Sequence, residues 1–390
     1  MSGSPGRPLA GTRPFRYDLR MSLLLVDTLR FARGWLRPRT TLREREVPVL
    51  PEESSTPVPA TLVEPSESGP LPGWVVLHGI TRPGRAHAGL LRFVRALATT
   101  GRRVLVPEIP EWRDMDFAPA RAQSIIRGAV DQLASDPDST EGGVVLLGFS
   151  FGAPQALVVA SDPAFRGRVR GVVGWGGYAD LERTFRFLCT GRHTLNGEVH
   201  HQRPDPYGRW VIGANCLPLV PGLKGSRPVA SALRALAVEA GERQVMAWDP
   251  SLERVRSQLR TGLPRTLRGL FDLFAPPDAA LPPAESVEEL TRTLAGAARR
   301  QLPLLDPLGT IEGIRAPVRL LHGRSDQLIP CSETPALARA LERRAPDLEW
   351  ALTGLFAHSG GASGVGPVAR MREAIEFGRV LGDVISIGES

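Results

Sequence analysis

The stretch GFSFG occupies residues 148–152, between the apolar run VVLL (144–147) and the helix-like segment APQALVVA (153–160). A strand that turns sharply into a helix needs glycine where its backbone passes close to neighbouring segments, because a side chain would obstruct that approach. Gly148 and Gly152 therefore predict a tight strand-to-helix turn with Ser150 at its crest, exposed above the carboxyl edge of a sheet. The alternative is a chance glycine-serine loop, and the flanking strand and helix patterns argue against it.

A serine presented in this way suits nucleophilic chemistry. The hydroxyl is a poor nucleophile unless a base removes its proton and two donors receive the oxyanion formed by attack on a carbonyl. Phe151 begins the new helix, so its free N–H is the first candidate donor. The second is the N–H of Ile80, because Gly79 lets the loop after the neighbouring strand fold back toward Ser150. His78 is interpreted as an orienting or packing residue; the alternative is that HGIT (78–81) is only a turn.

An acid and a base follow two later strands. Asp326 lies in LLHGRSDQLIP (320–330) and His358 in LFAHSG (355–360), each just past a buried strand and so at the same sheet edge. Ser150, Asp326 and His358 then occur in the chain order serine, acid, histidine. We expect His358 to act as the base and Asp326 to orient its ring. Asp180 is the rival acid, and the alternatives are a turn-forming Asp326 and a surface His358.

No metal or cofactor site is expected. Three cysteines in 390 residues are too few and too unpatterned for a disulfide framework or a paired zinc motif, which favours a reducing compartment. The pair His200-His201 has no carboxylate or cysteine at a zinc-like spacing, so both residues are interpreted as solvated or pocket-lining. The other histidines that compete poorly for the role of base are His87, His193 and His322.

Strand-like and helix-like segments alternate along most of the chain, which predicts an α/β fold with a mostly parallel sheet and helices on both faces. Two extended pieces at 40–50 and 58–64 predict an antiparallel start. After Asp180 the alternation stops for about 130 residues, whereas a crossover between parallel strands needs only about a dozen, so a subdomain is inserted there. Strands are expected at 73–79, 102–110, 142–149, 169–177, 316–323 and 348–354, and helices at 88–99, 117–134, 153–160, 180–190, 227–240, 250–260, 265–274, 286–301, 333–344 and 367–381.

These motifs together resemble the α/β-hydrolase fold family. The resemblance covers residues 40–180 and 310–382 and rests on LHGI (77–80), GFSFG (148–152), LLHGRSDQLIP (320–330) and AHSG (357–360). It implies a sheet of about eight strands and a largely helical cap inserted after the sixth strand. The expected organisation is a basic segment at 1–39, the first part of the core at 40–180, the cap at 181–309 and the second part of the core at 310–390.

The same resemblance carries over Ser150, Asp326 and His358 as a catalytic triad, with Phe151 and Ile80 as oxyanion donors. Dehalogenases and epoxide hydrolases of the family have an aspartate where Ser150 stands, so the resemblance argues against those chemistries. The loop at 78–81 also departs from the HGGG form of one lipase and esterase branch.

Aromatic and apolar residues in the expected cap are candidates for a substrate pocket. Phe185, Tyr207 and Trp210 lie in the inserted segment, and Phe149 precedes the serine. The alternative is that the cap residues form the core of a small helical subdomain. If they face the sheet edge instead, a medium apolar carboxylic ester is the expected substrate.

The N-terminal segment holds most of the net charge. Residues 1–46 contain ten arginines and four acidic residues, a balance of +6 of the total +7, so the rest of the chain is nearly neutral. No basic face interleaved with aromatics is visible there, and a nucleic-acid partner is not expected.

Within that segment, residues 22–36 place Leu25, Leu29, Ala32 and Leu36 on one helical face. The stretch is too short to span a bilayer, which leaves two interpretations: a helix packed on the domain, or peripheral membrane contact through residues 20–37.

The sequence therefore predicts a cytoplasmic serine hydrolase acting on a small-molecule carboxylic ester, with no cofactor. Association with a membrane is the alternative location. An acyltransferase, a peptidase or a C–C hydrolase on the same fold are the alternative enzymes. A non-catalytic binding protein on a hydrolase scaffold is the alternative from another class.

Overall fold

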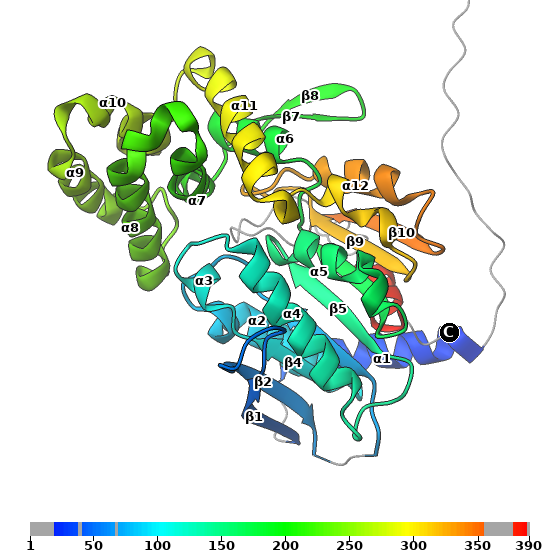
Figure 1. Cartoon of the computed structure of the whole chain (residues 1–390). Helices are drawn as coiled ribbons and strands as arrows, with labels where there is room; N and C mark the ends of the chain where they lie inside the picture. The colour runs from blue at the N-terminus through cyan, green and yellow to red at the C-terminus, as the bar shows by residue number, and fades with distance from the viewer. Residues whose placement is uncertain (1–18, 38–40, 67–68, 355–376, 388–390) are drawn as a thin grey trace, which may run out of the picture.

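The structure is a computed structural model that describes residues 19–37, 41–66, 69–354 and 377–387. Its central element is an eight-stranded sheet with the strand order β1-β2-β4-β3-β5-β6-β9-β10 (Figure 1). The strands are β1 Leu42–Val49, β2 Val58–Pro65, β3 Gly73–Leu77, β4 Arg103–Pro107, β5 Val144–Phe149, β6 Val169–Trp175, β9 Val318–Gly323 and β10 Leu348–Thr353.

Most of this sheet is parallel. β1 pairs antiparallel with β2, and β2 pairs antiparallel with β4, whereas every pairing from β4 through β3, β5, β6 and β9 to β10 is parallel. The predicted antiparallel start and mostly parallel, eight-stranded sheet are confirmed. Because β3, β4, β5, β6, β9 and β10 run in one direction, the loops that follow them meet at one edge of the sheet.

Helices cover both faces of the sheet, because side chains alternate along each strand. Val75 and Leu77 of β3 belong to the apolar layer under α4 (Pro119–Ala134), α5 (Gly152–Ser161) and α12 (Glu333–Leu341). Trp74 and Val76 face the opposite layer, which holds α2 (Ala88–Ala98) and the helical segment 377–385. A closing helix is expected over 367–381, and the part of it before 377 lies outside the described residues.

The N-terminal helix α1 (Leu19–Leu36) packs on α2. This agrees with the first of the two interpretations, a helix packed on the domain. Phe31 is buried and its ring makes an edge-to-face contact with Phe93 at 5.3 Å. Asp27 accepts a hydrogen bond from Arg102 at 2.7 Å. The face that packs is therefore not the face predicted to be apolar: Leu25, Leu29, Ala32 and Leu36 all point outward.

The chain between β6 and β9 forms the expected, largely helical cap, with helices that lie above one end of the sheet in Figure 1. Two of its elements are missing from the sequence expectation. One is helix α7, and the other is the antiparallel hairpin β7–β8. The described cap elements are α6 Leu181–Thr190, β7 Arg192–Leu195, β8 Glu198–His201, α7 Pro206–Cys216, α8 Arg227–Arg243, α9 Glu253–Gly262, α10 Arg265–Phe274 and α11 Ala284–Gln301.

Candidate active site

Ser150 lies at a strained turn between β5 and α5. Its backbone has φ of +52°, a left-handed conformation that costs a non-glycine residue about 1–2 kcal/mol. Its N–H donates to the Trp175 carbonyl at 2.7 Å, which holds the turn against β6. A Cβ on Gly148 would overlap the carbonyl of Gly152, and a Cβ on Gly152 would lie 2.8 Å from the His78 carbonyl. Both glycines are therefore required by close backbone approach, as the sequence predicts.

The loop after β3 packs directly on this turn. A Cβ on Gly79 would lie 3.3 Å from the Ser150 Cβ and 3.6 Å from its hydroxyl oxygen, so little space separates the loop from the serine. The next residue is Ile80, the expected second donor. Within the described part of the chain, no hydrogen bond is donated by the backbone amides of Ile80 or Phe151. An oxyanion formed at a serine needs two donors of this kind.

His78 fixes the shape of that loop. The ring is buried, its Nε2 accepts a hydrogen bond from the Ile109 amide at 3.1 Å, and its Nδ1 lies 2.7 Å from the Gly79 carbonyl. The buried Glu108 carboxylate also lies 3.3 Å from Nε2. The ring thus contacts two backbone groups and one carboxylate, and it orients the loop that contains Ile80.

Asp326 lies just past the end of β9 and is 1% exposed. Its Oδ1 accepts from the backbone amides of Leu328 and Ile329 at 2.9 and 3.0 Å. Its Oδ2 lies 3.3 Å from Nε2 of the buried His322. Hydrogen bonds from two amides favour the ionised form of a carboxylate. Asp326 and Ser150 line the same cavity.

Asp180, the rival acid, is used elsewhere. One carboxylate oxygen caps α6 by accepting from the Arg183 amide at 2.8 Å. The other accepts from Arg299 at 2.5 Å. The residue lines neither of the cavities that contain Ser150. Its carboxylate therefore serves the junction of α6 and α11.

The expected base, His358, lies outside the described residues. In the described part of the chain, two other histidines line the cavity that contains Ser150, namely His78 and His87. His87 precedes α2 and its Nδ1 accepts from the Leu90 amide at 3.4 Å. His87 was not the expected base, but the structure brings it to the same cavity as the serine.

Two cavities meet at Ser150. One, of about 90 Å³, extends beneath cap helices α6 and α7 and is lined by Phe185, Leu188 and Val211 among others. The other, of about 370 Å³, is lined by Phe149 and by four residues with no sequence signal for this role, Trp35, Leu90, Phe93 and Trp175. These four residues lie far apart in the sequence, so their shared position can be seen only once the chain is folded.

Tyr207 stands between these two cavities and lines both. Its hydroxyl donates to the Ile80 carbonyl at 3.0 Å. Burial, together with the nearby Asp205 carboxylate, raises the pKa of Tyr207 above its ordinary value, so the hydroxyl stays a donor. The structure thus brings Phe149, Phe185 and Tyr207 to the serine. It does not bring Trp210, which lines a separate cavity of about 430 Å³ inside the cap with Trp248.

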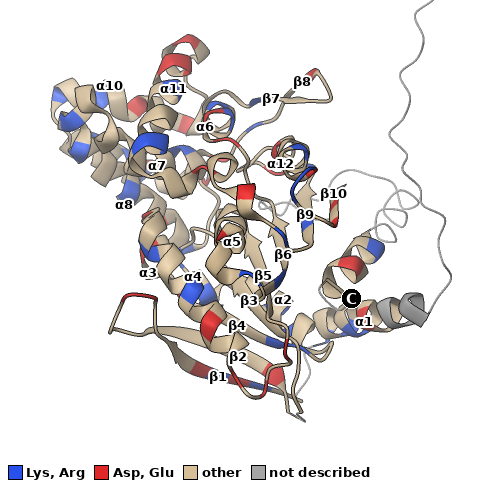
Figure 2. Cartoon of the chain, turned by 45° about the vertical axis from the view of Figure 1, so that its right-hand side comes forward, with Lys and Arg blue, Asp and Glu red and all other residues tan. Residues whose placement is uncertain are grey.

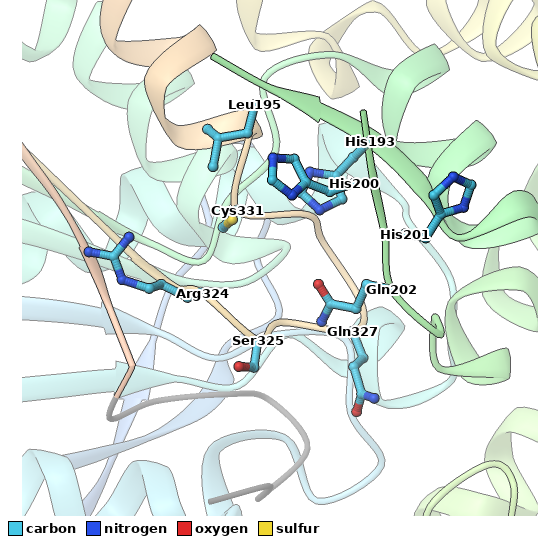
Figure 3. A pocket seen from close by; sticks show the side chains of 9 residues that line it. All are labelled: His193, Leu195, His200, His201, Gln202, Arg324, Ser325, Gln327 and Cys331. Atoms are coloured by element: carbon cyan, nitrogen blue, oxygen red, sulfur yellow. The ribbon is translucent and has the colours of Figure 1, made fainter. Parts of the chain in front are cut away.

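The histidines of the cap hairpin line a different cavity, of about 480 Å³, together with Arg324 and Cys331 (Figure 3). The rings of His193 and His200 stack with centroids 5.3 Å apart. Burial, followed by the proximity of His200, lowers the pKa of His193. Among the residues that the structure describes, no group of three or more histidine, cysteine or acidic side chains is arranged to hold a metal ion.

No described helix is both long and apolar enough to cross a membrane. No protein-family model matches the sequence, and no curated protein matches it either.

Solved structures do match the fold. Esterase Est22 is 12% identical, with 94% of this chain and 86% of that chain covered at a TM-score of 0.50. Brefeldin A esterase, a bacterial homologue of human hormone-sensitive lipase, is 16% identical, with coverages of 97% and 86% and a TM-score of 0.46. Pyrococcus horikoshii acylaminoacyl peptidase is 11% identical at a TM-score of 0.47; the match covers 88% of this chain and 43% of the peptidase.

At these identities the likeness concerns architecture, because one fold hosts many activities. The strand order, the parallel core, the strained turn after β5 and the cap inserted after the sixth strand agree with that architecture. The chain has the α/β-hydrolase fold.

Proposed function

We propose that this protein is a serine hydrolase that cleaves carboxylic esters through an acyl-enzyme. The observation that carries the proposal is the position of Ser150: its strained turn lies against the Gly79-Ile80 loop, and its cavity is shared with the buried carboxylate of Asp326. A nucleophile, two amides that donate no hydrogen bond to another described residue, and a buried carboxyl group at one sheet edge are the parts that acyl transfer to serine requires.

In the proposed mechanism, Ser150 Oγ attacks the ester carbonyl while His358 removes its proton. The amides of Phe151 and Ile80 donate to the oxyanion, where preorganised donors lower the barrier most. His358 then protonates the leaving alcohol, which departs and leaves an acyl group on Ser150. Water, activated by the same histidine, attacks this acyl-enzyme and releases the acid. Asp326 holds the imidazole in the required tautomer throughout.

The two cavities on either side of Ser150 support an ester with unequal halves. The 90 Å³ cavity under the cap is walled by apolar side chains and suits a short acyl chain. The 370 Å³ cavity has the rings of Trp35, Phe93, Phe149 and Trp175 among its lining residues and suits a larger apolar alcohol. The ester bond would lie between them, over the serine.

The experiment is stopped-flow hydrolysis of p-nitrophenyl esters of increasing acyl length by the full chain. The proposal predicts a stoichiometric burst of p-nitrophenol followed by slower turnover, because the acyl-enzyme accumulates. We expect acetate and butyrate esters to give higher kcat/KM than dodecanoate. Absence of both burst and turnover with every ester would contradict ester hydrolysis. A burst of p-nitrophenol without later turnover would instead indicate acyl transfer to an acceptor other than water.

The identity of the base is tested by exchanging two histidines for glutamine. We expect His358→Gln to lower kcat by at least about 10³-fold, because proton transfer to and from Ser150 is lost. His87→Gln is the matched variant: its ring lines the same cavity, but the mechanism gives it no proton to carry. It should keep kcat and change KM at most. The reverse pattern, with loss in His87→Gln alone, would assign the base to His87.

A further inference from the structure

The outer face of α1 is apolar and exposed. Leu25, Leu29 and Leu36 are 61%, 60% and 73% exposed, and Ala32 between them is exposed as well. With Val26, this one helix holds four of the eight large apolar side chains that are exposed in the described part of the chain. An aligned row of leucines on one helix is an interaction surface, whereas single exposed leucines scattered over a protein are ordinary.

Arginines run beside this row. Arg30, Arg33 and Arg37 are exposed beside the leucine row. Arg30 forms an ion pair with Asp27 at 3.5 Å, whereas Arg33 and Arg37 form no ion pair with another described residue. The second carboxylate oxygen of Asp27 accepts a hydrogen bond from Arg102 of the core at 2.7 Å. Figure 2 shows α1 at the edge of the molecule with its basic positions in blue. The surface therefore joins apolar side chains with positive charge, which is the composition of helices that lie in a lipid interface.

The inner face is fixed to the core. Thr99 Oγ1 donates to the Arg30 carbonyl at 3.0 Å, and Arg92 donates to the Trp35 carbonyl at 2.8 Å. A Cβ on Gly34 would lie 2.6 Å from Thr99 Oγ1, so the helix approaches α2 as closely as glycine permits. Rotation that would bury the leucines against the protein would break these contacts. The apolar row thus stays directed away from the fold.

The end of α1 also reaches the cavity of Ser150. Trp35 lines that cavity, and the next residue, Leu36, is the most exposed of the apolar row. A surface bound by Leu36 would therefore lie at the rim of the cavity. A second copy of this chain fits the leucine row less well than a lipid surface does, because a symmetric contact would place the arginines of the two copies against each other.

We propose that α1 binds an anionic lipid surface, with its leucine row among the acyl chains and its arginines on the headgroups, and that it seats the Ser150 cavity on that surface. The second part rests on the proposed ester hydrolysis and implies a lipophilic ester taken from the membrane. The first part stands without it.

The test is co-sedimentation of the full chain with phosphatidylcholine vesicles, with and without roughly one third phosphatidylglycerol. Wild type is expected to bind the anionic vesicles at least about tenfold more tightly than the neutral ones, and to release them in high salt. Leu25→Gln/Leu29→Gln/Leu36→Gln should weaken binding at least about tenfold. Val199→Gln/Leu281→Gln, which removes exposed apolar side chains elsewhere, is the matched control and should bind as wild type.

Failure of the two parts can be told apart. Ser150→Ala should bind vesicles as wild type does, because binding needs no catalysis. The triple leucine variant should keep wild-type kcat/KM on a soluble short-chain ester and lose turnover only of an ester carried in anionic vesicles. Equal binding of wild type and the triple variant would overturn the lipid proposal. A second result would also overturn it: wild type binds no vesicles but forms a dimer in sedimentation equilibrium, and the triple variant does not form that dimer.

Discussion

Replacing Ser150 by alanine is expected to lower kcat for p-nitrophenyl butyrate by at least about 10⁴-fold, because removing the nucleophile of a triad abolishes the acyl-enzyme route. The fold should persist, since the serine hydroxyl lines a cavity and donates no hydrogen bond to another described residue. Steady-state kinetics and circular dichroism of the purified variant measure the two effects separately.

The strained backbone adds a second readout at the same position. Ser150→Gly should be equally inactive but more stable than wild type by about 1 kcal/mol, because glycine adopts a φ of +52° without the cost that a side chain incurs there. Ser325→Ala is the control: this exposed serine lines the neighbouring histidine cavity and should keep full activity. An active Ser150→Ala, or an inactive Ser325→Ala with Ser150→Ala unaffected, would place the nucleophile elsewhere.

Asp326→Asn should lower kcat by about 10³ to 10⁴-fold while KM changes little, because the neutral amide no longer holds the base in its productive tautomer or stabilises its cation. The exchange is nearly isosteric. The asparagine carbonyl can still accept from the amides of Leu328 and Ile329, so the loop should keep its shape. Unfolding in denaturant should report a loss of about 1 kcal/mol.

Two further variants separate catalysis from folding. Asp326→Ala removes both amide contacts and should cost about 2 kcal/mol or more of stability as well as activity. Asp180→Asn should show the opposite pattern, a stability loss of up to about 1 kcal/mol from the weakened contact with Arg299 and unchanged kinetics. If Asp180→Asn were inactive and Asp326→Asn active, the acid would follow β6 instead of β9.

Much of the architecture could be predicted from the sequence because strands buried on both faces read as continuous apolar runs. Two such runs are VVLL of β5, which precedes GFSFG, and LL of β9, which precedes HGRSD. The turn residues that follow each run then indicate where the strand ends. The hairpin β7–β8 could not be predicted in this way. Its residues are mostly exposed, with histidine at 193, 200 and 201, so no face of it carries an apolar alternation.

The site was only partly predictable, for a physical reason. Ser150 and Asp326 follow buried strands of one parallel sheet, and strand direction alone brings their loops to a common edge. The prediction that Trp210 lines the substrate pocket is wrong because its helix, α7, turns one side to the serine and the other to the cap interior. Tyr207 and Val211 take the first side, whereas Trp210 takes the second.

Helix α1 shows a different limit. Its periodicity correctly separates Leu25, Leu29 and Leu36 from Phe31, but an apolar face is normally expected to be buried. In the structure Phe31, Gly34 and Trp35 are the residues that turn to the core, and the leucines remain outside. Which of two faces packs depends on the surface that receives the helix, here Thr99 and Phe93 of the α2 region.

The most direct test of the central claim, that Ser150 is the nucleophile, is labelling with a fluorophosphonate followed by peptide mapping by mass spectrometry. The account predicts one phosphonyl group per chain, on the peptide that contains GFSFG, with ester turnover lost in proportion to labelling. A label on another residue, or ester turnover that survives complete labelling of Ser150, would contradict it.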